Sequence, residues 1–159
     1  MHLWGVAIGR AEKLGFDEEA LYVASLTHDL GLTDRFRGAW PGAECFSLDS
    51  ASAARTVLDS DTVAEAITLH LNAAVSLERG PEAYLLQIGA ALDVTGYRFG
   101  DVERGTREAV LARHARQHMK REFSELMDGE VVLHPHSRPA FFTKRTGFKG
   151  MIERAPFEE

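Results

Sequence analysis

Three polar residues interrupt helical stripes of small and apolar residues at one shared spacing. They are His28, His70 and Asp93, and the residues seven, four and three positions before each of them are small or apolar. Positions with these separations share one face of an α-helix. The pattern therefore predicts three helices, each carrying a polar side chain on the face that points into the core, close to the end of the helix.

The rest of the chain also has helical rather than strand periodicity. Apolar spacing and capping residues predict helices over 3–14, 18–31, 49–58, 62–75, 81–96 and 106–126. The first of these enters its periodicity with no capping residue before it, as if the helix were joined midway. No segment alternates apolar and polar residues as a half-buried strand does, so we expect an all-α fold.

We expect one helical domain over 1–130, followed by a tail over 131–159. The tail contains Pro135, Pro139 and Pro156 together with several aromatic residues. We expect it to be mostly irregular and to pack on the same domain through Phe141 and Phe142.

Composition excludes several classes of partner. The 159 residues carry a net charge of −6, which disfavours a general surface for nucleic acid or an anionic membrane. No apolar run is long enough to span a bilayer, and the N-terminus lacks the basic region of a signal peptide. With one cysteine there is no internal disulfide. We expect a cytoplasmic protein whose partner is a small-molecule substrate, with neither nucleic acid nor membrane bound.

The polar residues on the core-facing stripes are of the types that bind metal ions. A buried carboxylate such as Asp93 needs a cation or strong donors. Asp29 follows His28 directly, and both can reach an ion at the flank of the helix. Imidazole and carboxylate suit divalent zinc, iron or manganese. Singly, His70 can be a hydrogen-bonded core histidine and Asp93 can cap the turn at 95–96, but together they favour a metal site.

Four segments carry a family resemblance. ALYVASLTHDLGLTDRF resembles the helix and loop that give the HD superfamily of metal-dependent hydrolases its name. CFSLDSASAARTVL, VAEAITLHLN and GAALDVTGYRF follow in the order seen in the cyanamide-hydratase-like branch. The resemblance covers residues 3 to about 104 and implies an HD-type helical bundle.

The resemblance also implies a ligand set. His28, Asp29 and Asp93 would bind a divalent metal together with one more histidine, which in the family stands about two turns before the position of Trp4. Met1 comes after that point, so we expect a first helix without that histidine. His2 is the nearest histidine and is a candidate in its place.

The resemblance further implies hydrolysis or hydration of a small molecule by metal-activated water, with nitrile hydration favoured. Asp29 and His70 are the candidate catalytic residues. Thr27, Asn72 and Arg35 are assigned to substrate binding.

Two alternatives stay open. One is a phosphohydrolase acting on a nucleotide or another phosphoester, which needs arginine or lysine aimed at phosphate; Arg35, Arg37 and Arg98 are candidates. The other is an inactive HD domain that serves as a binding module. Helical domains of this family commonly pair, so a homodimer is also expected.

Overall fold

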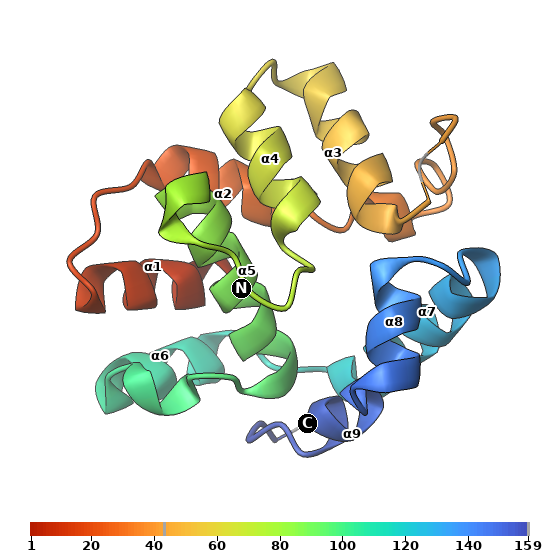
Figure 1. Ribbon diagram of the computed structural model, residues 1–159. Helices are drawn as coiled ribbons and strands as arrows, with labels where there is room; N and C mark the ends of the chain where they lie inside the picture. Colours follow the sequence, from red (N-terminus) through yellow and green to blue (C-terminus); the bar gives the residue numbers. More distant parts are fainter. Residues whose placement is uncertain (43, 159) are drawn as a thin grey trace.

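The helix expected over 81–96 lies at the centre of the computed structural model, which describes residues 1–42 and 44–158 (Figure 1). This helix, α5, spans Pro81–Thr95 and ends at Gly96, whose φ of 76° is left-handed. Leu85, Leu86 and Leu92 are fully buried in it. A helix that is apolar around most of its circumference must be covered on several sides, which explains its central place.

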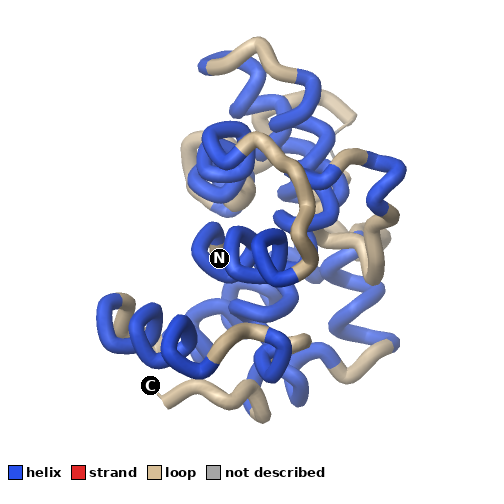
Figure 2. Tube along the Cα trace, turned by 90° about the vertical axis from the view of Figure 1, so that its left-hand side faces the viewer, coloured by secondary structure: helices blue, strands red, loops and turns tan. Residues whose placement is uncertain are grey.

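Helices α1, α2, α4 and α9 contact α5, and the remaining helices pack outside them. In chain order the α-helices are α1 His2–Ala11, α2 Glu18–Thr27, α3 Phe46–Val57, α4 Asp61–Leu69, α5 Pro81–Thr95, α6 Arg104–Arg113, α7 Met119–Leu133, α8 Arg138–Arg145 and α9 Phe148–Glu153, with 3-10 turns at Leu30–Leu32, Leu77–Arg79 and Phe99–Asp101. Figure 2 shows helices and loops but no strand over the described ranges. The expected all-α fold is confirmed.

Helices α1 and α5 approach each other through glycine. A Cβ on Gly5 would lie 2.9 Å from the carbonyl oxygen of Leu85, and one on Gly89 would lie 3.0 Å from the carbonyl oxygen of Met1. Such separations leave no room for a side chain. The close approach places Trp4, which is buried, beside the last turns of α5.

Helices α2 and α4 carry the stripes that end in His28 and His70, and α3 packs against α4. α2 and α4 pack against each other, and both contact α5. Asp17 caps α2 by accepting from the backbone N–H of Glu19 and Ala20, and Ser60 caps α4 through Val63. α3 begins at Phe46, three residues before the predicted start.

The expectation of an irregular tail is wrong. α7 continues through residue 130 to Leu133, and α8 and α9 follow. Ser137 caps α8 by accepting from the N–H of Ala140, and Pro139 lies in the first turn, where proline is tolerated. Phe141 is 59% exposed, so the tail does not pack through it as predicted. Instead, Ile152 of α9 is fully buried, and α9 contacts α5 and α7.

The single helix expected over 106–126 is two helices. α6 ends at Arg113, and Gln117 and His118, whose φ angles of 46° and 67° are left-handed, come directly before α7. The break turns Arg116 inward onto α5, where it binds Asp93. Across residues 1–42 and 44–158, no helix is long and apolar enough to cross a membrane.

Candidate metal centre

The ends of α2 and α4 bring two histidines and one aspartate together. His28 is the C-terminal capping residue of α2, Asp29 follows it, and His70 is the C-terminal capping residue of α4. The two imidazole rings meet edge to face with their centroids 5.1 Å apart. The stripe positions predicted from the sequence thus place His28 and His70 side by side, because α2 and α4 pack against each other.

The three side chains form a group that could hold a metal ion. One ligand atom from each lies within 4.8 Å of the others. Nε2 of His28 is 2.9 Å from Oδ2 of Asp29, and Nε2 of His70 is 3.9 Å from Oδ1 of the same carboxylate. This Asp29 carboxylate therefore lies between the two imidazoles.

The orientation of both imidazole rings is fixed by backbone carbonyls. Nδ1 of His28 lies 2.8 Å from the carbonyl oxygen of Ser25, and Nδ1 of His70 lies 2.6 Å from that of Ile67. A carbonyl oxygen can only accept, so Nδ1 carries the proton in each ring. Metal-bound histidines commonly have such a bond at the other nitrogen, because it orients the ring and leaves Nε2 for the ion.

Burial and the neighbouring charges set the ionisation of the group. Burial, joined by the charge of His28, lowers the pKa of His70 to about 4. Burial opposes the charged forms of Asp29 and His28, but their mutual attraction outweighs it, lowering the pKa of Asp29 and raising that of His28. Near neutral pH, Asp29 is an anion and His70 a neutral imidazole, which are the forms that bind metals. The contact with Asp29 favours the protonated ring of His28, so a bound ion would have to replace that proton on Nε2.

Helix α3 holds the turn that follows Asp29. The backbone N–H of Gly31 donates to Oγ of Ser50 at 2.8 Å, and that hydroxyl donates to the carbonyl of Phe46 at 2.9 Å. A Cβ on Gly31 would lie 2.1 Å from the same carbonyl oxygen, so only glycine fits. Asp49, also buried, accepts from the N–H of Gly38 at 2.8 Å. These bonds fix the path of the chain that follows Asp29.

Asp93 lies outside this group of ligand atoms. Its Oδ1 accepts from Nε1 of Trp4 at 2.9 Å and from Nη1 of Arg116 at 2.6 Å, and the amino group of Met1 is 3.6 Å from its Oδ2. The buried Asp93 carboxylate, which requires a cation or strong donors, thus finds both among the protein's own groups. The expected ligation of a metal by Asp93 together with His28 and Asp29 finds no support in this arrangement.

His2 does not join the group either. Its ring lies edge to face with Tyr22 at 5.2 Å, and its Nε2 is buried without a hydrogen-bond partner among the described residues. Burial lowers the pKa of His2, which favours the neutral ring. Its ring is therefore half-buried against the exposed Tyr22 and away from His28 and His70.

The residues assigned to substrate binding have different surroundings. Thr27 donates its hydroxyl to the carbonyl of Val23 at 2.8 Å, a bond within α2. Arg35 is exposed, with its guanidinium 5.0 Å from the centre of the Phe36 ring. Asn72, two residues past His70, lines a cavity. Of the three residues assigned to substrate binding, Asn72 is the one that lines this cavity.

The arginines considered for phosphate binding are engaged elsewhere. Nη2 of Arg37 donates to the carbonyl of Leu32 at 2.7 Å. Arg98 forms ion pairs of 2.6 Å with Glu12 and 2.7 Å with Asp101. Neither side chain is free to turn toward His28 and His70.

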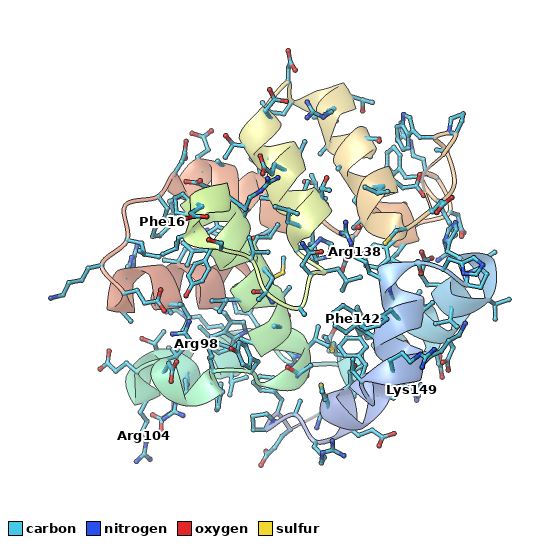
Figure 3. The ribbon with its side chains drawn as sticks, viewed as in Figure 1. Phe16, Arg98, Arg104, Arg138, Phe142 and Lys149 are labelled. Atoms are coloured by element: carbon cyan, nitrogen blue, oxygen red, sulfur yellow. The ribbon has the colours of Figure 1, made fainter. Side chains whose placement is uncertain are left out.

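Arg138 is the arginine that sequence reasoning missed. It lies at the start of α8, and its Nη1 donates to the carbonyl of Thr68 in the last turn of α4 (Figure 3). Its positive charge is one of the causes of the low pKa of His70, after burial and the charge of His28. The Ser-Arg-Pro start of α8 is a helix-capping signal, and this signal places Arg138 on a helix rather than in an irregular tail.

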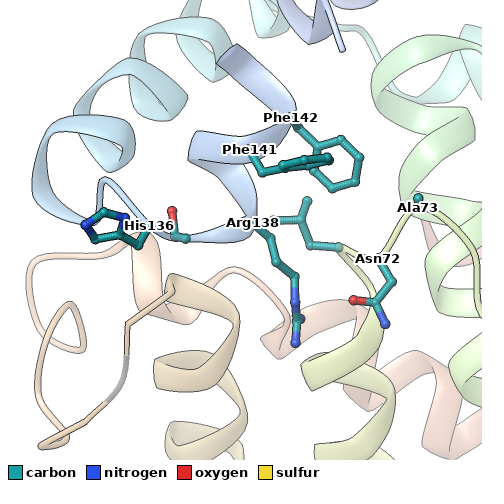
Figure 4. A pocket seen from close by; sticks show the side chains of 8 residues that line it. Asn72, Ala73, His136, Arg138, Phe141 and Phe142 are labelled. Carbon is teal, nitrogen blue, oxygen red and sulfur yellow. The ribbon is translucent and has the colours of Figure 1, made fainter. Parts of the chain in front are cut away.

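The cavity beside Arg138 has a volume of about 280 Å³. Figure 4 shows the rings of Phe141 and Phe142 together on one side of the cavity, and the Arg138 side chain extending from α8 toward the end of α4, the end from which Asn72 projects. The cavity is an opening between the N-terminal helices and the C-terminal ones, next to the end of α4.

A comparison with protein-family models gave no match, and neither did a comparison with curated protein sequences.

Proposed function

We propose that the chain binds a divalent metal ion through His28, Asp29 and His70 and uses it in the hydrolysis or hydration of a small molecule. The observation that carries the proposal is the convergence of three ligand atoms within 4.8 Å, with both imidazoles oriented through Nδ1. The residues fit such an ion, because two imidazoles and one carboxylate are a common donor set for zinc, iron and manganese.

The chemistry of the bound ion would be that of a Lewis acid: it lowers the pKa of water and polarises a nitrile, carbonyl or phosphoryl group. The chain's own residues supply the rest. His28 and His70 orient the site through their carbonyl bonds, and Asp29 supplies the negative charge that neutralises part of the ion's charge. Asp29 is also the candidate for receiving a proton.

Two substrate classes remain within the proposal. The resemblance to the cyanamide-hydratase-like branch of the HD superfamily supports nitrile hydration. The place of Arg138 beside His70 supports a phosphoester, because guanidinium binds phosphate through paired hydrogen bonds. A binding module without catalysis is the alternative that an activity assay separates from both.

The first test is metal binding. Purified protein, stripped with a chelator and reconstituted with Zn²⁺ or Mn²⁺, should hold about one ion per chain by elemental analysis. His28→Ala and Asp29→Asn should each lose that ion or bind it far more weakly. His114→Ala is the matched control, because His114 is exposed and distant in sequence from the group. No ion retained by the wild-type protein after reconstitution would refute the metal site.

The second test is activity of the reconstituted protein on cyanamide and on 4-nitrophenyl phosphate. If the wild-type protein turns over one of these substrates and Asp29→Asn does not, that substrate identifies the reaction class. A protein that binds the ion and turns over neither a nitrile nor a phosphoester favours the binding module.

A further inference from the structure

Arg138 is a half-buried cation whose hydrogen bond goes to a main-chain carbonyl and not to an acid. Its Nη1 donates to the carbonyl of Thr68, and over residues 1–42 and 44–158 no carboxylate lies within 4.0 Å of its guanidinium. A guanidinium carries five N–H donors, and one carbonyl uses only part of them. The others make no hydrogen bond to the described residues, and the Arg138 side chain is among those that line the cavity at the start of α8. Arginine in this setting is suited to an anion with two oxygen atoms.

The residues that line the cavity with Arg138 include both aromatic and polar side chains. Phe141 and Phe142 line the cavity, and Phe141 is 59% exposed although it is aromatic. Asn72 adds an amide that can both donate and accept. A volume of about 280 Å³ is just below the usual range of ligand pockets, about 300–1,000 Å³, so the molecule would be small, with one ring at most.

One short segment of the chain connects the cavity with the candidate metal centre. Thr68, which accepts from Arg138, lies two residues before His70, and Asn72 lies two residues after it. An anion on Arg138 would therefore lie next to the end of α4 that carries His70. With a divalent ion held by His28, Asp29 and His70, the two positive charges would reinforce each other for an anionic molecule.

We propose that this cavity binds a small organic anion, with Arg138 holding its acidic group and Phe141 and Phe142 contacting its apolar part. The inference deepens the proposed function, on which it rests for the place of the metal, by naming the class of substrate: an aromatic or apolar carboxylate or phosphate. Arg138 is then the residue that selects for charge.

Calorimetric titration of the Zn²⁺-loaded protein with benzoate, phenyl phosphate and neutral benzamide tests the inference. We expect one or both anions to bind, and the better of the two distinguishes a carboxylate from a phosphate site. Arg138→Gln keeps an N–H for the Thr68 carbonyl but removes the charge. This variant should weaken the binding of the anions about tenfold or more and leave the affinity for benzamide unchanged. Phe141→Ala should weaken all three probes.

Arg145→Gln is the matched control, because it removes the same charge from the exposed far end of the same helix. It should leave binding unchanged. Equal affinity of wild type and Arg138→Gln for both anions, or an equal loss in Arg145→Gln, would overturn the inference. So would a wild-type protein that binds neither anion.

Amide chemical shifts of the wild-type protein give a second measurement that needs no variant. Phenyl phosphate should shift Asn72, Ala73 and Phe141, and shifts confined to other segments would overturn the inference. The same titration on metal-free protein separates the two proposals. Anion binding that depends on Arg138 in a chain that retains no metal would support the anion site and refute the metal centre. A protein that binds the metal ion but neither anion would support the metal centre and refute the anion site.

Discussion

The guanidinium of Arg116 binds Asp93 twice over, through the side chain and the main chain. Nη1 lies 2.6 Å from Oδ1, and Nη2 lies 2.5 Å from the carbonyl oxygen of the same residue. Arg116 also lies over the ring of Phe157, with its central carbon 4.5 Å from the ring centre. One side chain thus joins α5, the break between α6 and α7, and the C-terminal segment.

Replacing Arg116 by methionine should destabilise the protein by about 1–3 kcal/mol, because the variant leaves the part-buried Asp93 carboxylate without its charged donor. Chemical denaturation measured by circular dichroism checks this. Arg113→Met, at an exposed position three residues earlier, is the control and should change the free energy of unfolding little. Equal stability of wild type and Arg116→Met would contradict the structural role.

The stabilisation from Asp93 should depend on pH in a defined direction. Burial favours the neutral carboxyl, but the amino group of Met1 and Arg116 outweigh it and lower the pKa below 3.8 in the folded state. A lowered carboxyl pKa stabilises the fold above the unfolded-state pKa, and the stabilisation is lost as pH falls through the folded-state value.

The difference in unfolding free energy between wild type and Asp93→Asn should therefore be constant from about pH 6 to 7 and shrink below about pH 4. Denaturation series at several pH values measure it. A difference that grows on acidification would show that Asp93 is not held as an anion.

Ser50→Ala should both destabilise the fold and weaken metal binding. The variant removes the acceptor of the Gly31 N–H and leaves that buried donor unpaired, at a cost of about 1–3 kcal/mol. Because Gly31 follows Asp29 by two residues, the carboxylate loses its fixed position. Ser52→Ala on the same helix is the control. Calorimetric titration with Zn²⁺ and thermal unfolding should separate the two variants.

Glu130→Ala should loosen the start of α3. The fully buried Oε1 of Glu130 accepts from the backbone N–H of Phe46 at 3.0 Å and from Nδ1 of His134 at 2.8 Å. Loss of this acceptor leaves the buried Phe46 N–H unpaired and should cost about 1–3 kcal/mol. Glu125→Ala, exposed on the same helix, should cost little. Faster hydrogen exchange at Phe46 in Glu130→Ala alone would confirm the contact.

The sequence predicted that the stripes of His28, His70 and Asp93 would meet, and the structure brings His28 and His70 together for a physical reason. Each histidine is the last residue of the core-facing stripe of its helix. The stripe therefore fixes the face of the helix from which each ring projects. The helix ends were less predictable: α2 stops at Thr27 and α4 at Leu69, earlier than the apolar pattern indicated, since 3-10 and irregular turns continue the apolar spacing.

Asp93 shares the same pattern but has different partners, and no local signal could reveal them. Its cationic partner Arg116 is 23 residues away in sequence, in a segment whose helical composition hid the break at Gln117 and His118. Arg138 was missed for a related reason: proline content obscured a capped helix. Pairings between distant segments depend on packing, which residue periodicity does not specify.

The position of Arg138 separates two tasks within one small chain. The three proposed metal ligands, His28, Asp29 and His70, all lie in the first half of the sequence, whereas Arg138 belongs to α8. In the proposed function, substitutions in α8 would therefore change which anions bind while the proposed metal ligands stay as they are. Selectivity and reactivity can evolve along this polypeptide at independent rates.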